Sequence, residues 1–224
     1  METMKKLARI SLLLSALIVG VHAHAQDGNA AAGKAKASMC MGCHSIPGYQ
    51  ASFPEVYKVP ALAGQNAKYI VAALGEYAKG ERKHPTMRGI AQSLSEQDTK
   101  DLAAFFEQLG KGVQEGPVPD TATPPPAVAA IMAKANCQSC HGANFSKPLT
   151  GNEPKLAGQH ADYLYAALKA YQTTNSAVVG RSNAIMGGMV QGLNHDDLHA
   201  IADYLATLPT ELHTVPESRF RFEH

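Results

Sequence analysis

The chain has 224 residues, of which 45% are hydrophobic and 17% charged, and its formal net charge is +1. A chain so close to neutrality lacks the strongly basic surface that nucleic-acid binding requires, and it has no charge excess for tight adhesion to anionic lipid. These values therefore exclude nucleic-acid binding, and only peripheral membrane association is left open.

Residues 1–25 are predicted to form a cleavable signal peptide. Three basic residues precede an almost wholly apolar run over residues 10–21, and Ala23-His24-Ala25 has the small-x-small form of a cleavage site. The apolar run has 12 residues, whereas a membrane span needs about 20. An uncleaved anchor is the alternative. Cleavage after Ala25 would remove a net charge of +2 and leave a mature chain near −1.

Three helices are predicted after the signal peptide. The first covers residues 28–39, with Asp27 as its N-cap, and leads into Cys40-Met41-Gly42-Cys43-His44. The second covers residues 66–79. The third begins at Ser95, a good N-cap residue, and shows apolar residues at i, i+3, i+4 and i+7. No alternating run is long enough to predict a strand.

The same pattern returns after about 97 residues, which marks an internal repeat. The segment Pro60-Ala61-Leu62-Ala63-Gly64-Gln65 recurs as Pro154-Lys155-Leu156-Ala157-Gly158-Gln159. The corresponding helices are predicted over residues 127–136, over residues 160–172 and from Asn194 onward. Five prolines within residues 116–126 indicate a stiff, extended spacer between the copies.

The fold class expected is therefore all-α, with two tandem domains over residues 26–115 and 127–210. Residues 116–126 form the linker between them, and residues 211–224 form a tail outside the repeat. We expect this tail to be frayed by default. It could instead clasp a partner or the protein's own surface.

The four cysteines of the chain all lie in two Cys-x-x-Cys-His motifs, at residues 40–44 and 137–141. This pentapeptide is the attachment signature of c-type haem: two thiols bond to one porphyrin, and the following histidine binds the iron. The motifs thus predict two covalent haems, bonded to Cys40, Cys43, Cys137 and Cys140, with His44 and His141 as proximal ligands.

Paired cysteines have three other common uses. A structural zinc site normally has its second pair roughly 15–20 residues away, whereas Cys43 and Cys137 lie 94 positions apart. A thioredoxin-like redox pair needs a βαβ pattern, which is missing. Two disulfides would leave both trailing histidines unexplained. Because c-type haem is attached outside the bacterial cytoplasm, the motifs agree with the export signal and predict a periplasmic protein.

Two methionines are the candidates for the second axial ligand of each iron. Met87 and Met186 lie the same seven positions before the matched Leu94 and Leu193, and both are predicted to lie in a loop. A methionine ligand raises the reduction potential relative to bis-histidine ligation. Core packing is the alternative role for both, and Met189 is the rival ligand in the second domain.

His84 and His160 could in principle be distal ligands. Neither has a histidine at the matching position of the other copy, so both are predicted to be surface residues, and the unmatched His195, His199 and His213 are predicted to be solvated. The prolines at positions 60 and 154 are candidate carbonyl acceptors for the second N–H of the proximal imidazoles; shaping a turn is the alternative. Four tyrosines are expected beside haem, or else simply in the core: Tyr69, Tyr77, Tyr163 and Tyr171.

With its two haem motifs, matched methionines and duplicated Pro-x-Leu-Ala-Gly-Gln turn, the chain resembles the dihaem cytochrome c₄ family over about residues 26–210. The resemblance implies two class I-type cytochrome c domains, each of about three main helices around one covalent haem. It implies a periplasmic electron carrier with His44 and Met87 on one haem, and His141 and Met186 on the other. The longer stretch between Tyr171 and Met186 and the long spacer depart from the pattern.

Three functions follow as expectations. The first is a monomeric carrier that takes electrons from membrane respiratory complexes to a terminal oxidase or a similar acceptor. The second is the cytochrome subunit of a larger dehydrogenase, such as a flavin-dependent one. The third, a haem enzyme such as a peroxidase or nitrite reductase, is disfavoured because it requires an open axial position. The chain is therefore expected not to be an enzyme.

Overall fold

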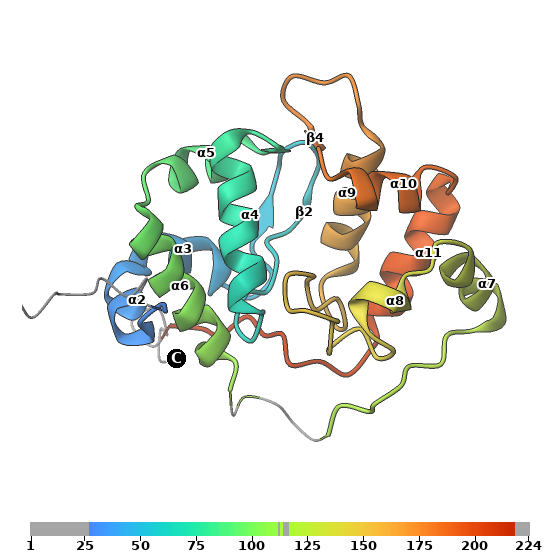
Figure 1. The fold of residues 1–224 in the computed structure, drawn as a ribbon, viewed down its shortest axis with the longest axis horizontal. Helices are drawn as coiled ribbons and strands as arrows, with labels where there is room; N and C mark the ends of the chain where they lie inside the picture. The colour runs from blue at the N-terminus through green and yellow to red at the C-terminus, as the bar shows by residue number, and fades with distance from the viewer. Residues whose placement is uncertain (1–26, 112, 114–116, 218–224) are drawn as a thin grey trace, which may run out of the picture.

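The computed structural model describes residues 27–111, 113 and 117–217. Its helices and strands divide into two lobes joined by an extended linker (Figure 1). The first lobe contains α2 (Ala30–Lys36), α3 (Ser38–His44), β1 (Gln50–Ala51), β2 (Tyr57–Lys58), α4 (Ala67–Lys79), β3 (Arg82–Lys83), α5 (Pro85–Gln92) and α6 (Glu96–Leu109). The second contains α7 (Pro126–Lys134), α8 (Gln138–His141), α9 (Ala161–Gln172), β4 (Gly180–Arg181), α10 (Ala184–Val190) and α11 (His195–Ala206). The expected all-α class with two helical lobes is confirmed.

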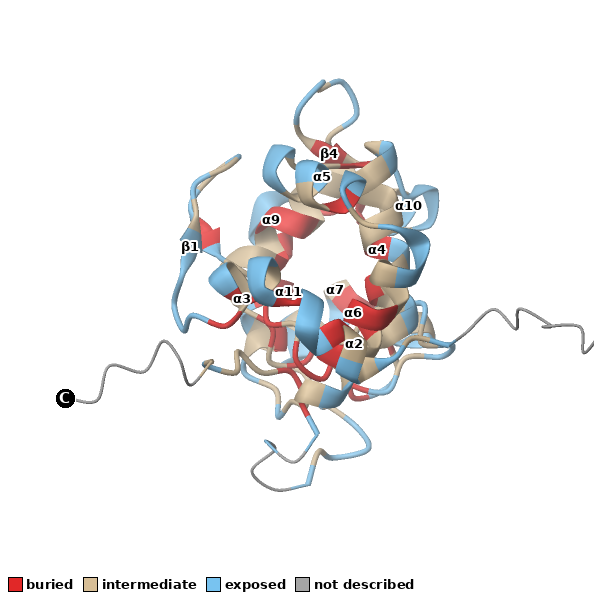
Figure 2. Cartoon of the chain, turned by 90° about the vertical axis from the view of Figure 1, so that its left-hand side faces the viewer, coloured by how far each residue is buried: buried red, intermediate tan, exposed pale blue. Residues whose placement is uncertain are grey.

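Each lobe has its own hydrophobic core. In the first lobe the core forms where α6 packs against α2 and α4, and Leu102 and Phe106 are buried there. In the second lobe α11 packs against α7 and α9 around Leu198 and Ile201. Figure 2 shows the buried residues on the inner sides of α6 and α9, whereas α5 and α10 are mostly exposed. Residues far apart in the sequence thus bury the predicted apolar helix faces within each repeat.

The third helix of each repeat begins as predicted. The Ser95 side chain accepts the backbone N–H of Asp98, and the Asp98 carboxylate accepts the N–H of Ser95, which forms a capping box. Asn194 and Asp197 form the same pair at the start of α11. These reciprocal bonds satisfy backbone donors that the first helical turn leaves without partners.

The first helix differs from the prediction. It begins at Ala30, and its N-cap is Asn29 rather than Asp27, because the Asn29 side chain accepts the N–H of Ala32. The helix also breaks at Ala37, so that α2 and α3 are separate elements. The buried Ala37 side chain lies in the core at this break, and tertiary packing thus overrides a continuous helical pattern.

The structure contains four strands within the described residues, which the sequence did not predict, and each has two residues. They are too short to produce a period-2 pattern. β3 and β4 pair antiparallel across the two lobes, with Arg82 opposite Arg181. This pairing arises from the docking of the lobes, which the local sequence does not encode.

The first part of the tail is ordered against both lobes, so the default expectation of fraying is wrong for residues 211–217. Leu212 is buried, Glu211 forms an ion pair with Lys155, and the His213 N–H donates to the Ala63 carbonyl at 2.9 Å. Figure 1 shows this red segment running from the second lobe back to the first. Residues 211–217 therefore clasp the protein's own surface. The predicted signal peptide and residues 218–224 lie outside the described residues.

Among the residues that the structure describes, no helix is both long and apolar enough to cross a membrane.

Candidate functional site

The first Cys-x-x-Cys-His motif lies on α3. Cys40 and Cys43 are three positions apart on this helix, so their side chains share a face. Met41 is buried in the core and anchors the helix there, and Cys40 packs against the same cluster. All four cysteine thiols are free and half-buried, so the disulfide alternative does not form.

The His44 ring is oriented by the Pro60–Gln65 turn. Its Nδ1 lies 2.9 Å from the Pro60 carbonyl oxygen. A carbonyl only accepts hydrogen bonds, so Nδ1 carries the proton and Nε2 presents a lone pair. Burial lowers the pKa of His44, although the Pro60 carbonyl opposes this shift. The ring is therefore held as neutral imidazole, the form that binds a metal.

The second motif repeats this arrangement at α8. His141 is 7% exposed, and its Nδ1 lies 3.1 Å from the Pro154 carbonyl oxygen. Burial again lowers the pKa of the imidazole, against the opposing effect of that carbonyl. The predicted role of both prolines as carbonyl acceptors is confirmed.

Met87 and Met186 do not lie in loops, contrary to the prediction. Each is the third residue of a short helix, α5 or α10, and each is half-buried. The helices form because an N-cap side chain accepts the methionine N–H: His84 Nδ1 accepts from Met87 at 3.3 Å, and Asn183 Oδ1 from Met186 at 3.0 Å.

The two methionines are therefore equivalent in three dimensions as well as in sequence register. Met186 also packs against the core of the second lobe, as the core-filler alternative requires. Met189 is 43% exposed. The binding of each methionine to the same metal as the histidine of its lobe stays a prediction.

Three histidines predicted at the surface are half-buried instead: His84, His160 and His213. His84 caps α5, and its ring packs edge-on against Phe53, with ring centroids 5.9 Å apart. Burial lowers the pKa of His84 and of His160. His195 and His199 are exposed, as expected, although both contact the Tyr165 ring.

Two arginines that the sequence analysis did not single out lie between the lobes. Arg82 and Arg181 are partners in the β3–β4 pair. The Arg82 guanidinium lies over the rings of Tyr69 and Tyr77, and its Nη1 donates to the Tyr69 hydroxyl at 3.0 Å. The sequence could have identified these arginines as a matched pair, because each precedes the matched methionine of its repeat by five positions.

The second lobe presents the same arrangement. Arg181 lies over the rings of Tyr163 and Tyr171, and donates to the Tyr163 hydroxyl at 3.2 Å. The four tyrosines thus converge on the arginines, with two hydroxyls bonded to guanidinium groups. Burial raises the pKa of Tyr69, against the opposing effect of Arg82.

The charge of this cluster is unbalanced. Glu76 pairs with Arg82, at 2.8 Å from its Nη2. Within the described ranges, 27–111, 113 and 117–217, no carboxylate forms an ion pair with Arg181. A buried and a half-buried cation with one carboxylate provide a favourable environment for additional acidic groups.

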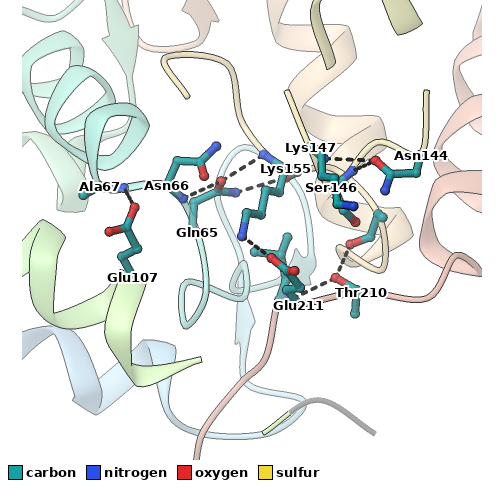
Figure 3. A network of polar contacts seen from close by, with 12 residues as sticks. Gln65, Asn66, Ala67, Glu107, Asn144, Ser146, Lys147, Lys155, Thr210 and Glu211 are labelled. Carbon is teal, nitrogen blue, oxygen red and sulfur yellow. Dashed lines mark hydrogen bonds and ion pairs between the residues drawn. The ribbon is translucent and has the colours of Figure 1, made fainter. Parts of the chain in front are cut away.

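The lobes are also joined through the two repeated turns. Gln65 reaches the backbone of Lys155 in the second lobe (Figure 3), and Gln159 reaches the backbone of Ala61 in the first. Figure 3 also shows the Lys155–Glu211 ion pair beside this contact. Both glutamines are almost fully buried.

The residues present fit a covalent haem in each lobe. Each motif offers two free thiols beside a neutral imidazole whose Nδ1 proton is held by a carbonyl. Within the described part of the chain, no cluster of three or more His, Cys, Asp or Glu residues could hold a metal ion by itself. Those residues accordingly offer no ready-made zinc cage.

Comparison with known proteins agrees with this geometry. A family model described as "Cytochrome c" matches residues 30–110 and 127–209. The chain is 31% identical over 205 residues to cytochrome c4 of Pseudomonas aeruginosa, across 89% of this chain and 97% of that protein. It is 28% identical to a "Thiosulfate dehydrogenase electron acceptor" of Stutzerimonas stutzeri, across 87% of this chain and 92% of the relative.

Two solved structures share the fold. The crystal structure of reduced recombinant cytochrome c4 from Pseudomonas stutzeri aligns with a TM-score of 0.58 at 26% identity, and covers 81% of this chain and 99% of that one. A thiosulfate dehydrogenase from Marichromatium purpuratum aligns with a TM-score of 0.53 at 27% identity, over 76% of this chain and 36% of that one.

Proposed function

This chain belongs to the dihaem cytochrome c₄ family, and from that membership we propose that it carries electrons in the periplasm between membrane respiratory complexes and a terminal oxidase or similar acceptor. Its two cytochrome c domains hold two covalent haem c groups, at Cys40 and Cys43 and at Cys137 and Cys140. The domain boundaries that we propose are residues 26–115 and 127–210.

The axial ligands that we propose are His44 with Met87, and His141 with Met186. This assignment rests on one arrangement that occurs in both lobes. In each lobe a proline carbonyl accepts the imidazole Nδ1–H, and the methionine is the third residue of a helix whose N-cap side chain accepts the methionine N–H. One lobe alone would suit ordinary core packing. The same pair of arrangements in both copies supports ligation.

Bound haem supplies an iron centre that cycles between ferric and ferrous states. The proline carbonyls orient the imidazoles of His44 and His141, and the histidine and methionine of each lobe would together hold its iron. With both ligands bound, neither iron would have a vacant site for a substrate. This favours an electron carrier over a peroxidase or a nitrite reductase.

We further propose that Arg82 and Arg181 bind haem propionates. The two guanidinium groups lie over tyrosine rings, and the carboxylate of Glu76 pairs with Arg82 alone. Propionates are carboxylates, so they would balance the charge and accept hydrogen bonds from guanidinium N–H groups. Their position between the lobes would direct the acidic edges of both haems toward the interface.

The proposed location is the periplasm, reached by cleavage of residues 1–25. The support is chemical: thioether attachment to Cys-x-x-Cys-His takes place outside the bacterial cytoplasm, and the first residues have the form of an export signal. Sequencing of the mature protein should find Gln26 at its N-terminus. Recovery of holoprotein that still carries residues 1–25 would support an anchored form instead.

A second candidate is the cytochrome subunit of a dehydrogenase. It is favoured by one specific observation: relatives from Stutzerimonas stutzeri and Thiomonas intermedia are named thiosulfate dehydrogenase electron acceptors, at 28% and 26% identity. The dihaem arrangement would then accept electrons from a partner enzyme. The ordered part of the tail binds residues 63 and 155 of its own chain, so the bonding groups at these positions already have partners within this chain.

Purification from native extract separates the two candidates. A free carrier should elute from gel filtration as a monomer, with a mass below the 23.7 kDa of the full chain because residues 1–25 have been removed. It should be reduced by respiring membranes and reoxidised by the membrane oxidase. Co-elution with a dehydrogenase, and reduction only when that enzyme's substrate is added, would establish the subunit role instead.

A further inference from the structure

The two glutamines that end the repeated turns cross between the lobes. Gln159 is 4% exposed; its Oε1 accepts the Ala61 N–H and its Nε2 donates to the Ala61 carbonyl, both at 3.0 Å. Gln65 is 2% exposed and makes the same pair of bonds with Lys155, at 2.9 and 3.0 Å. Each glutamine therefore binds the residue that follows the proline of the opposite lobe, and Figure 3 shows this for Gln65 and Lys155.

These contacts reach the proximal histidines through one peptide group each. The Pro60 carbonyl accepts from His44 Nδ1, and the N–H of the same peptide unit, on Ala61, donates to Gln159 Oε1. In the second lobe the Pro154 carbonyl accepts from His141, and the N–H of Lys155 donates to Gln65. Each histidine is thus two hydrogen bonds away from a side chain of the other lobe.

The electronic consequence follows from amide resonance. When a peptide N–H donates a hydrogen bond, more negative charge accumulates on the carbonyl oxygen of that peptide, and the oxygen becomes a better acceptor. A better acceptor strengthens the bond from the imidazole Nδ1–H and makes the imidazole a more basic ligand. A more basic ligand stabilises ferric iron and lowers the reduction potential.

We propose that Gln65 and Gln159 are positioning residues for the iron ligand of the opposite lobe: Gln159 acts on His44, and Gln65 acts on His141. This inference rests on the proposed function, in which both histidines bind haem iron. Each lobe lowers the potential of the other's haem through a buried peptide group. The contacts that dock the lobes are then the same contacts that lower the reduction potentials of the two haems.

Other contacts between the lobes supply matched controls. Asn66 Nδ2 donates to the Glu153 carbonyl at 3.2 Å, and Lys169 pairs with Glu55 at 2.8 Å. Neither contact includes the peptide unit that holds a proximal histidine. Asn66→Ala and Lys169→Ala therefore weaken the docking without altering the proposed connection.

The test is a potentiometric titration of the holoprotein, with each haem identified from the assigned ring signals of its histidine in NMR spectra. Gln159→Leu should raise the potential of the His44 haem and leave the other unchanged, and Gln65→Leu should do the reverse. The control variants Asn66→Ala and Lys169→Ala should leave the reduction potentials of both haems unchanged. Equal shifts at the two haems, equal shifts in the controls, or no shift in either leucine variant would overturn the proposal.

A charged variant checks the sign and guards against a leucine variant that fails to fold. Gln159→Glu keeps an oxygen acceptor for the Ala61 N–H, and its negative charge also favours ferric iron. The potential of the His44 haem should therefore not rise in this variant. A rise like that expected for Gln159→Leu would contradict the inference.

Amide hydrogen exchange provides a readout that does not depend on iron ligation. Gln159→Leu should accelerate exchange at the Ala61 N–H, and Gln65→Leu at the Lys155 N–H. Faster exchange with unchanged potentials would overturn the positioning role but leave the proposed function intact. Loss of low-spin histidine-ligated iron in the wild-type protein would instead refute the proposed function, whatever the exchange rates.

Discussion

Arg82 of the first lobe and Arg181 of the second are paired opposite each other in the β3–β4 ribbon. Each guanidinium lies over two tyrosine rings of its own lobe. The pairing places a buried cation, Arg82, and a half-buried one, Arg181, at the contact between the lobes, and the Glu76 carboxylate pairs with Arg82. Such a concentration of positive charge affects both the stability of the lobes and the potentials of nearby redox centres.

Neutralising the arginines should have unequal effects. Arg82→Met leaves the half-buried Glu76 carboxylate without its partner, and we expect the free energy of unfolding to fall by about 3 kcal/mol. Arg181→Met removes the proposed propionate contact and leaves no protein carboxylate without a partner, so its cost should be smaller. Because a nearby positive charge favours reduced iron, Arg181→Met should lower at least one potential.

Chemical denaturation and potentiometric titration of the holoproteins measure both effects. Lys111→Met is a suitable control, because it removes an exposed positive charge outside the cluster. Unchanged potentials in both arginine variants would rule out their proposed contact with the propionates.

Replacing the proposed methionine ligands should change the absorption spectrum. Met87→Ala and Met186→Ala should each remove half of the weak far-red iron–thioether band of the oxidised protein, and each should lower one potential because the thioether favours ferrous iron. Met189→Ala, one turn away on α10, is the control. If Met186→Ala preserves the band while Met189→Ala removes it, the assignment in the second lobe is wrong.

Gly33 should not tolerate a side chain. It is buried on α2 where this helix crosses α6, and an added Cβ would lie 2.0 Å from the Asp101 carbonyl oxygen. Because that atom is backbone, the helices must separate, and we expect Gly33→Ala to destabilise the first lobe by about 1–3 kcal/mol. Thermal unfolding of the holoprotein measures the loss.

Gly75 on α4 provides the matched control, since an added Cβ there meets nothing within 4 Å beyond the adjoining backbone of its own helix. Gly75→Ala should be neutral or stabilise the helix by up to about 1 kcal/mol. Equal stability of the two variants would contradict the close helix crossing.

The first lobe should also respond to acid through a cluster on α2 and α6. Lys36 and Ser95 lower the pKa of Asp98 to about 2, and the Asn29 N–H, Lys36 and Gln97 lower that of Asp101 to about 2. Because folding depresses both pKa values, the stabilisation is complete above about pH 4, the ordinary carboxyl range. It is lost as the pH falls through about 2.

An acid titration followed by the amide signals of α2 should therefore show this helix loosening between about pH 4 and pH 2. The second lobe has Ala200 at the position of Asp101, so the α7–α11 contact provides an internal control. Asp101→Asn should weaken the contact of α2 with α6 at neutral pH, and the loosening of α2 between about pH 4 and pH 2 should become smaller. An unaltered transition in this variant would argue against the role of the carboxylate.

Much of the candidate site could be predicted from the sequence because its parts are local or repeated. The haem motifs depend on spacing within five residues, and the capping residues Ser95 and Asn194 act on their own helices. Met87 and Met186 could be matched by counting from leucines. Their helical setting was missed because it depends on one capping bond in each copy, from His84 and from Asn183.

The sequence by itself determined the chemistry: two haem attachment motifs, a duplicated helical unit and matched ligand candidates, all recorded in short-range spacing and repeat register. Only the tertiary structure decided how the copies meet. Gln159 and Ala61 are 98 positions apart, and Arg82 and Arg181 pair across separate lobes. Such contacts depend on the relative orientation of two folded units, and no local pattern of residues encodes that orientation.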